Sequence, residues 1–423
     1  MHHSIDLTEL PAAGPEMAEA VSNCVHCGFC LPVCPTYSVL GEEMDSPRGR
    51  IFLMKEVLEG NLDQGSVQPY VDRCLGCMAC VTACPSGVEY GELLFPYRAE
   101  DHSQEGSNRW QRLRRRLTLS VLPFPQRLRL ALRLGRWTRF AHRLAPAGLQ
   151  PLTRMIPERL PPRVPQPVVA SPPGKPVARV ALLPGCAQSV LAPQIHADTV
   201  HLLTANGVEV VRPRADVCCG SLDLHAGEAD AARTHARHLL AALPTDVDAV
   251  ITNAAGCGSG IHEYPLLFKG TDDQEAMSDL ARRSVDICSF LARLPSLTPM
   301  QLPRPLRVAY HDACHLQHAL KVVSEPRTLL GQVENLELVE IGGDGFCCGS
   351  AGIYNIDHPE TADRLGAAKA AAVADTGAAC LATGNIGCLN QLQLHLAGRG
   401  LDIPVRHTVS VLADALPPSN GPA

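Results

Sequence analysis

Two cysteine runs of identical spacing constrain this chain more than any other feature of its sequence. Residues 24–35 read CVHCGFCLPVCP, and residues 74–85 read CLGCMACVTACP. In each run, two residues separate the first cysteine from the second, and two separate the second from the third. The fourth cysteine follows after three further residues and directly precedes a proline. Three thiolates on one tight loop can bind one face of a metal cluster, whereas the fourth lies too far along the chain to complete the same site.

The runs therefore predict two [4Fe–4S] clusters of the ferredoxin type with exchanged fourth ligands. The first cluster is expected at Cys24, Cys27, Cys30 and Cys84, and the second at Cys34, Cys74, Cys77 and Cys80. The alternatives are a pair of zinc sites or a disulfide framework. Zinc usually takes two Cys-x2-Cys pairs or a mixture of cysteine and histidine. Neither alternative requires a cysteine triple followed by Cys-Pro in two places.

Composition narrows the class of protein. A chain of 423 residues is long enough for two or three domains. Its 4% aromatic content and net charge of −6 argue against binding to nucleic acid. Eighteen cysteines in a chain of this length indicate metal ligands in a reducing compartment rather than a secreted disulfide scaffold. The first ten residues do not resemble a secretory signal, and no apolar run is long enough to span a bilayer, so the cytoplasm is the expected location.

The first half of the chain is expected to contain two parts. Residues 15–100 should form an α-helical ferredoxin-like domain, because helical periodicity dominates around both runs. Within it, Ser46 followed by Pro47 is a typical helix start, so a helix is expected over residues 48–58. Residues 101–177 should form a basic helical segment and a linker, in which seven prolines fall between residues 161 and 176.

The basic segment has an unusual charge pattern. Residues 108–143 contain eleven arginines, interleaved leucines and no acidic residue. Helices are expected over residues 108–120 and 125–144, separated by prolines. One interpretation is a peripheral contact, through residues 108–145, with the inner face of the cytoplasmic membrane. The alternative is a solvated helical pair, or a pair that faces an acidic partner.

The second half contains an internal repeat, with copies expected at residues 178–300 and 301–423. Matching cysteines of the two copies are 128 to 131 residues apart, which indicates a duplicated domain. The cysteines concerned are Cys186, Cys218, Cys219 and Cys257 in the first copy, and Cys314, Cys347, Cys348 and Cys388 in the second. Each copy alternates apolar strands with helices, which predicts α/β domains with parallel sheets. Strands are expected at residues 179–183, 207–212, 249–252, 306–310, 336–341 and 379–383. The cysteines follow these strands, and ligands gather at the carboxyl ends of parallel strands, so each set should converge.

At these residues the chain resembles the family of glycolate oxidase iron–sulfur subunits. The resemblance covers nearly the whole chain and includes MDSPRGRIFLMKE between the two runs, YHDACHLQH at the start of the second copy, and FCCGSAGIYN later in it. The iron–sulfur subunits of anaerobic glycerol-3-phosphate dehydrogenase and of L-lactate utilisation have a similar layout, as does heterodisulfide reductase. The fold expected from all of this is a multidomain α+β chain, with a helical ferredoxin-like domain followed by two duplicated α/β cysteine-rich domains.

The resemblance implies an electron-transfer subunit with no catalytic residue of its own. A partner flavoprotein would oxidise glycolate to glyoxylate on its FAD, and the two clusters would pass the electrons towards a quinone-type acceptor. The sequence contains no flavin, nicotinamide or phosphate-loop motif, in agreement with that division of labour. The alternatives are an iron–sulfur subunit of a lactate or glycerol-3-phosphate dehydrogenase, a thiol–disulfide enzyme like heterodisulfide reductase, or a free electron carrier.

The repeated domains depart from the heterodisulfide reductase pattern, in which each cysteine set ends in Cys-x2-Cys. Gly260 and Gln391 occupy the positions of that last cysteine, so each set keeps four cysteines. Four thiolates can hold a further cluster or zinc, remain without metal, or act as a redox pair. Cys288 and Cys380 are expected to be buried as small apolar residues. Nearby histidines could hydrogen-bond a thiolate, carry protons or merely orient ligands: His225, His311, His315 and His318 in the repeat, and His26 in the first run.

Overall fold

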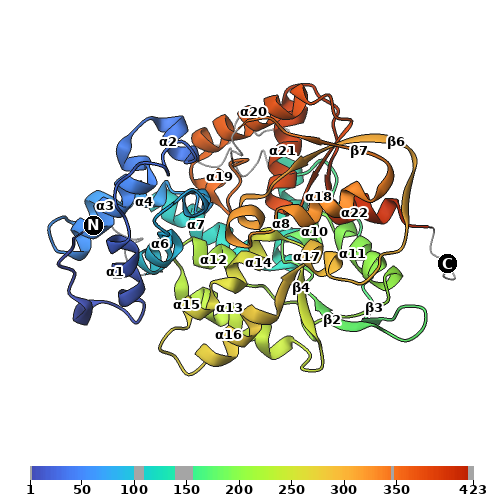
Figure 1. The fold of residues 1–423 in the computed structure, drawn as a ribbon, viewed down its shortest axis with the longest axis horizontal. Helices are drawn as coiled ribbons and strands as arrows, with labels where there is room; N and C mark the ends of the chain where they lie inside the picture. The colour runs from blue at the N-terminus through green and yellow to red at the C-terminus, as the bar shows by residue number, and fades with distance from the viewer. Residues whose placement is uncertain (1, 100–108, 139–155, 344–346, 418–423) are drawn as a thin grey trace.

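The computed structural model describes residues 2–99, 109–138, 156–343 and 347–417. A helical N-terminal unit lies against a larger body that contains two β-sheets (Figure 1). The order of elements therefore agrees with the expected α+β architecture, in which the helical unit precedes two α/β domains.

Helices make up the N-terminal unit, and its described residues contain no strand. They are α1 (Gly14–Ser22), α2 (Pro35–Leu40), α3 (Pro47–Leu58), α4 (Gln64–Asp72), α5 (Ala79–Thr82) and α6 (Tyr90–Ala99), with short 3-10 turns at Leu7–Glu9 and Glu43–Asp45. The predicted start of α3 is confirmed, because the Gly49 N–H donates to the Ser46 side chain and Pro47 occupies the first turn. Met17, Met54 and Leu93 are fully buried in the core of this unit.

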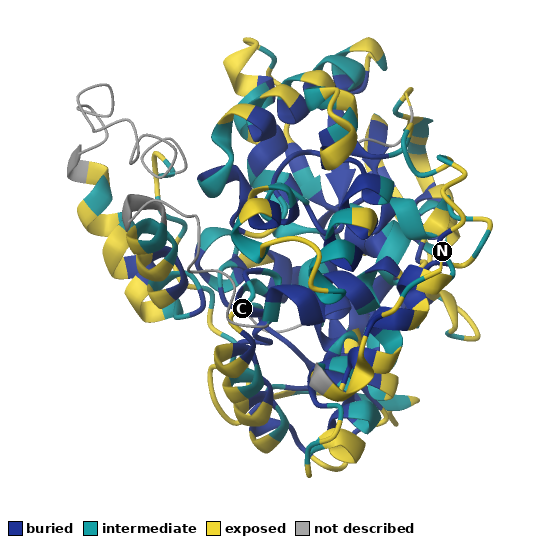
Figure 2. Ribbon diagram, turned by 90° about the vertical axis from the view of Figure 1, so that its left-hand side faces the viewer, coloured by how far each residue is buried: buried dark blue, intermediate teal, exposed yellow. Residues whose placement is uncertain are grey.

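The basic segment forms two helices, α7 (Arg109–Val121) and α8 (Pro125–Thr138). Both agree with the predicted helices, although residues 139–144 of the second prediction lie outside the described residues. The inner face of α7 packs on the larger body, where Leu119 contacts a small buried cluster with Ala226 and Ile353. The opposite faces of both helices are exposed (Figure 2).

The first sheet contains five strands in the order β1-β3-β2-β4-β5. Its strands are β1 (Val169–Ala170), β2 (Ala178–Leu182), β3 (Val208–Val211), β4 (Ala249–Thr252) and β5 (Ser284–Asp286). All neighbours are parallel except β1, which pairs antiparallel with β3 from within the proline-rich stretch. The helices around it are α10 (Gln188–Leu191), α11 (Gln194–Ala205), α12 (Ser221–His225), α13 (Ala229–Ala242), α14 (Ala255–His262), α15 (Tyr264–Leu267), α16 (Gln274–Arg283) and α17 (Ile287–Ala292).

The second sheet is parallel throughout, with the order β7-β6-β8-β9. Its strands are β6 (Met300–His311), β7 (Val333–Glu340), β8 (Cys380–Thr383) and β9 (Val405–His407). The accompanying helices are the π-helical turn η5 (His315–Ala319), α18 (Ser324–Gly331), α19 (Tyr354–Asp357), α20 (Pro359–Asp375), α21 (Ile386–Gly398) and α22 (Thr408–Asp414). All six predicted strands are present, whereas the short strands β1, β5 and β9 were not expected.

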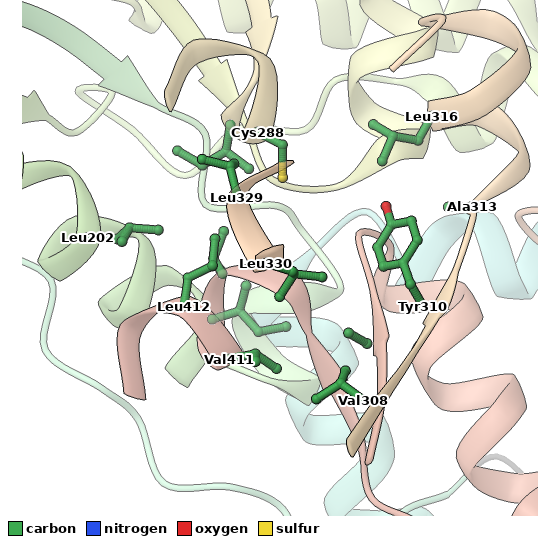
Figure 3. Packing of buried hydrophobic residues seen from close by; sticks show 14 of the residues in the cluster. Leu202, Cys288, Val308, Tyr310, Ala313, Leu316, Leu329, Leu330, Val411 and Leu412 are labelled. Carbon is green, nitrogen blue, oxygen red and sulfur yellow. The ribbon is translucent and has the colours of Figure 1, made fainter. Parts of the chain in front are cut away.

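The two sheets share one hydrophobic core. Leu202 of α11 belongs to the first copy, Leu330 and Leu412 belong to the second, and all three lie in the same buried cluster (Figure 3). Cys288 and Cys380 are 2% exposed in this cluster, as predicted for small apolar residues. The two copies are therefore fused into one body, which fixes the position of one cysteine set relative to the other.

Candidate iron–sulfur sites

The eight cysteines of the two runs line two adjoining cavities. The wall of the first contains Cys24, Cys27, Cys30 and Cys84, and the wall of the second contains Cys34, Cys74, Cys77 and Cys80. This is the grouping expected from the spacing, with the last cysteine of each run turned towards the other run. The cavities adjoin because Cys80 lies in both walls. All eighteen cysteines are free thiols, so each cavity offers at least four sulfur donors, the number that a cubane cluster requires.

The two cysteine loops share one backbone conformation. His26 and Gly76 follow the first cysteine of their runs by two residues, and both have positive φ, at 56° and 64°. Gly28 and Met78 follow by four residues and have φ of 84° and 60°. Left-handed backbone is unfavourable for histidine and methionine, and such strain is typical of functional loops. Residues with positive φ at every second position turn successive backbone N–H groups towards one point, where these groups can stabilise an anion such as a cluster.

A buried arginine supports the second cavity. Arg50 is 1% exposed, and its guanidinium donates to Asp45 at 3.1 Å, to the Thr36 hydroxyl at 3.0 Å and to the Tyr70 carbonyl at 2.7 Å. Thr36 Oγ1 lies 3.2 Å from Cys34 Sγ, so Arg50 positions a neighbour of a candidate ligand. Much of the stretch MDSPRGR is explained by these contacts and by the cap at Ser46.

Arg98 places a second positive charge beside the same cavity. Its guanidinium donates to the carbonyls of Val71 and Cys74, both at 2.7 Å. Burial raises the pKa of the Cys74 thiol, but the charges of Arg50 and Arg98, together with hydrogen bonds from Gly76 and Tyr90, bring that pKa below its ordinary value. Sequence reasoning missed both arginines, although a charged residue on the apolar face of a predicted helix is a signal that could have indicated Arg50.

The first cavity lies near the surface. Cys27 is exposed, and the apolar side chains beside it are open to solvent, with Val25 and Phe29 65% exposed and Phe52 45% exposed. We call Val25, Phe29 and Phe52 the apolar rim. Burial is less complete here than at the second cavity, where Cys34 is buried and the other three cysteines are half-buried.

The first cysteine set of the repeat gathers at the carboxyl ends of β2, β3 and β4. Cys218 Sγ lies 3.6 Å from Cys186 Sγ. Hydrogen bonds from the thiols of Cys218 and Cys257 hold the pKa of Cys219 well below its ordinary value. The predicted convergence of these four cysteines is therefore present, and its hydrogen bonds favour the thiolate form of Cys219.

The second set has the same order of contacts. Hydrogen bonds from Cys314 and Cys348 hold the pKa of Cys347 well below its ordinary value, and a hydrogen bond from Cys348 lowers that of Cys388 to about 5. Two buried cysteines with lowered pKa values therefore share Cys348 as a hydrogen-bond partner. Negative charge on both would be costly without a compensating cation, which favours metal binding.

A histidine and a lysine distinguish the second set from the first. His311 is 2% exposed, and one of its ring nitrogens lies within 4.8 Å of the sulfurs of Cys348 and Cys388. Leu183 occupies the matching position of the first copy. Lys369, 7% exposed, also faces these thiols, and burial lowers its pKa against their opposing charges. The sequence indicated His311, which is close to Cys314, but not Lys369. Lys369 lies in α20, and the sequence links no other residue of that helix to the site.

The missing fifth cysteine has a physical explanation in each copy. A Cβ atom at Gly260 would lie 2.5 Å from Cβ and Oγ of Ser221, so α14 approaches α12 too closely for any side chain there. Gln391 is 5% exposed and accepts a hydrogen bond of 3.0 Å from Asn355. Gly260 could not accept a fifth thiol without local rearrangement, whereas at position 391 the side chain serves a buried hydrogen bond instead.

The second cavity lies against the second cysteine set. Cys347 belongs to a small buried cluster, and Cys77 and Cys314 both pack on that cluster. His315 connects three parts of the chain, because its ring nitrogens lie 3.2 Å from the Gly76 carbonyl and 2.9 Å from the Ser259 hydroxyl. Burial lowers the pKa of His315 to about 3, so it is neutral and structural. The cysteines therefore form a continuous series in space: the exposed loop at Cys27, then the second cavity, then the second cysteine set in the interior.

Two cysteine-lined cavities in a helical unit, backed by two fused cysteine-rich α/β domains, define an iron–sulfur electron-transfer protein. Comparison with known families agrees: residues 20–88 match the 4Fe-4S dicluster domain, and residues 180–262 and 308–393 match the cysteine-rich domain. A probable glycolate oxidase iron-sulfur subunit from Bacillus subtilis is 36% identical over 423 residues, with 93% of each chain covered. The glycolate oxidase iron-sulfur subunit from Escherichia coli is 34% identical over 404 residues, again with 93% of each covered. The chain belongs to the glycolate oxidase iron–sulfur subunit family.

A more distant relative covers part of the chain. Lactate utilization protein A from Oceanobacillus iheyensis is 30% identical over 235 residues, which is 55% of this chain and 96% of that protein. Among the helices of the described residues, none combines the length and the apolar character needed to cross a membrane.

Proposed function

We propose that this chain carries electrons from a glycolate-oxidising flavoprotein to a quinone-type acceptor. One [4Fe–4S] cluster binds in each cysteine-lined cavity. The observation that carries the proposal is the position of the cavities: one opens at the surface beside Cys27, and the other is buried against the second cysteine-rich domain. Electrons enter at the exposed cavity and leave from the buried one. Hydride removal takes place on the FAD of the partner, so this chain supplies no general base.

The substrate is tested in the assembled complex. The chain is co-expressed with its flavoprotein partners, and dye reduction is measured with glycolate, other 2-hydroxy acids and glycerol 3-phosphate. Glycolate should give the highest kcat/KM. Faster turnover with lactate would replace the proposal by the lactate alternative, which the likeness to lactate utilization protein A favours.

Burial of the repeat cysteines argues against a thiol–disulfide enzyme. Six of these eight cysteines are buried, and the other two, Cys257 and Cys314, are half-buried. A substrate disulfide must be reached by an accessible thiolate, so these sets are better suited to hold metal or to stabilise the fold.

The apolar rim is the proposed docking surface for the flavoprotein. A solvent-exposed aromatic beside a redox centre is the kind of residue that dominates binding when a partner covers it. Replacing Phe29 by glutamate should weaken partner binding by about tenfold or more, the effect of losing a hot-spot aromatic. Binding is measured by interferometry on the cluster-loaded chain, together with the rate at which the reduced partner delivers electrons.

Leu62 provides the matched control for Phe29. It is 39% exposed in the same unit but does not line the first cavity, so Leu62→Glu should leave the affinity unchanged. Equal affinities for the two variants would place the docking surface elsewhere.

The second cysteine set is the proposed site of additional metal, with His311 as a further ligand. The supporting observations are its two lowered thiol pKa values and the proximity of His311. Metal analysis should find iron or zinc beyond the roughly eight irons of two cubanes. Cys347→Ser should remove this excess and His311→Ala should weaken its retention about 10–100-fold against a chelator, whereas Cys218→Ser should leave it in place. Loss of the excess from Cys218→Ser alone would assign the metal to the first set instead.

Helices α7 and α8 are proposed to lie on an anionic membrane surface. Their outer faces carry Leu113, Leu117, Leu130 and Leu134, which are 47–62% exposed, among arginines with no acidic residue between them. The contact should appear as cosedimentation with anionic vesicles that weakens at high salt. Equal binding to neutral vesicles would contradict the electrostatic part.

A further inference from the structure

A cavity lies where the N-terminal unit, α7 and both cysteine-rich domains meet, and we call it the junction cavity. Its walls come from the loop that carries Cys74, from arginines of α6 and α7, and from the turn after Cys-Cys-Gly in each copy. The space inside it that water-sized groups can occupy is about 100 Å³, and the cavity continues into open solvent. A wall at Cys74 places this space directly beside the second cysteine cavity.

The lining combines an apolar surface with a hydrogen-bonding one. Leu75, Leu222 and Ile353 supply apolar contacts. Tyr354 and His358 also face the cavity and lie side by side, with ring centroids 4.7 Å apart. Burial lowers the pKa of His358 to about 4, so at neutral pH its uncharged imidazole can either donate or accept a hydrogen bond. A ligand with an apolar ring and carbonyl acceptors on its edge matches these two surfaces.

The remaining wall carries charges of both signs, with four arginines in excess over the carboxylates of Asp72 and Asp357. Arg112, Arg114 and Arg115 come from the inner side of α7, and Arg114 pairs with Asp357 at 3.5 Å. The Nε atom of Arg115 is buried and has no hydrogen-bond partner among the described residues. Positive charge beside the ligand favours the addition of an electron to it.

The same helix connects the junction cavity with the exposed leucines. Arg115 lies on the inner face of α7, whereas Leu113 and Leu117 lie on its outer face. A ligand dissolved in a lipid surface under α7 and α8 would therefore be only one helix away from the junction cavity.

We propose that the junction cavity binds the ring of a lipid-soluble quinone and that the quinone is reduced there to the quinol. This inference rests on the proposed function, which supplies the electrons: oxidation of the 2-hydroxy acid to the 2-oxo acid releases two electrons and two protons on the partner. The electrons arrive at the Cys74 side of the junction cavity one at a time. Two protons from solvent reach the quinone oxygens through Tyr354 and His358, so that both carbonyls become hydroxyls.

The test compares two acceptors in the purified complex. Tyr354→Phe and His358→Gln should each lower the rate with a short-chain ubiquinone by about tenfold, the loss of one hydrogen bond to the ligand. Substrate-dependent reduction of an artificial dye should remain within twofold of the unsubstituted complex, because the dye takes electrons from exposed centres. His262→Gln, an exposed residue outside the junction cavity, is the control and should affect neither acceptor.

Each outcome decides between the two proposals. Unchanged quinone reduction in both variants overturns the junction cavity as the quinone site but leaves the proposed function intact. Absence of dye reduction in the unsubstituted complex contradicts the proposed function itself. If a variant loses both activities, equilibrium binding of the short-chain quinone to the oxidised complex decides: affinity about tenfold weaker supports the site, and unchanged affinity overturns it. Binding of phosphate that Arg115→Gln abolishes, with quinone binding unaffected, would assign the junction cavity to an anion instead.

Discussion

Replacing Cys34 by serine should remove roughly four of the roughly eight iron atoms expected in the two cavities. Cys34 belongs to the first run, yet it lines the second cavity together with Cys74, Cys77 and Cys80. A serine hydroxyl is a poor substitute for a thiolate at iron, so the cluster lost should be the one at the second run. Substrate-dependent quinone reduction should fall to background, because the electrons could no longer reach the buried end of the relay.

Double substitutions identify which cluster each cysteine serves. Cys34→Ser combined with Cys77→Ser should retain the same roughly four irons as either single variant, because both residues line one cavity. Cys34→Ser combined with Cys27→Ser should retain almost none, since Cys27 lines the other. Cys380→Ser, at a buried thiol outside both cavities, controls for general destabilisation. Almost complete loss of iron from the Cys34/Cys77 pair would show that each run ligates its own cluster.

The position of Cys34 beside the cysteines of the second run could be predicted because it depends on spacing alone. Three residues between Cys30 and Cys34 move the fourth thiol out of reach of its own loop, whatever the surroundings. Strands β4 and β8 were predictable for a similar reason, because every residue in them is buried and each appears as a short apolar run followed by a turn. The repeat then placed the cysteines after matching strands, and the parallel topology brought them together.

Features that depend on contacts between distant segments could not be predicted. Strands β5 and β9 have three residues each, too few to produce a periodic signal, and their pairing with longer strands defines them. The shared core joins Leu202 to Leu412 across two copies that look like separate domains in the sequence. Arg98 is one arginine among many, and only the fold shows that it binds the Cys74 carbonyl.

The stretch between the two runs shows how family resemblance and physical explanation differ. MDSPRGR supports the resemblance as a string of letters, but the string does not say which arginine matters. Arg48 pairs with Glu43 at the surface, where their side chains are 29% and 48% exposed. Arg50 pairs with Asp45 in the interior, where theirs are 1% and 3% exposed. The difference in burial predicts very different consequences for the same substitution two residues apart.

Arg50→Met should lower the free energy of unfolding by about 3–5 kcal/mol, because it leaves the buried carboxylate of Asp45 with fewer partners. Arg48→Met is the matched control on the same helix and should cost no more than about 1 kcal/mol, as expected for an exposed ion pair. The change in the free energy of unfolding is measured by anaerobic chemical denaturation, from the shift of the midpoint. Similar shifts for the two variants would mean that the interior pair is not the structural support of the second cavity.

The same pair of variants tests the electrostatic role of Arg50. A reduced cluster carries one more negative charge than an oxidised one, so a buried positive charge beside it makes reduction easier. Arg50→Met should therefore lower the reduction potential of the cluster held by Cys34 and Cys74, while Arg48→Met leaves that potential unchanged. Arg50→Lys keeps the charge but loses the planar set of hydrogen bonds. Its reduction potential should therefore be closer to that of the unsubstituted chain than its free energy of unfolding is. The reduction potential is measured by anaerobic redox titration followed by electron paramagnetic resonance. An unchanged potential in Arg50→Met would exclude Arg50 as the residue that directs electrons from the exposed cavity to the buried one.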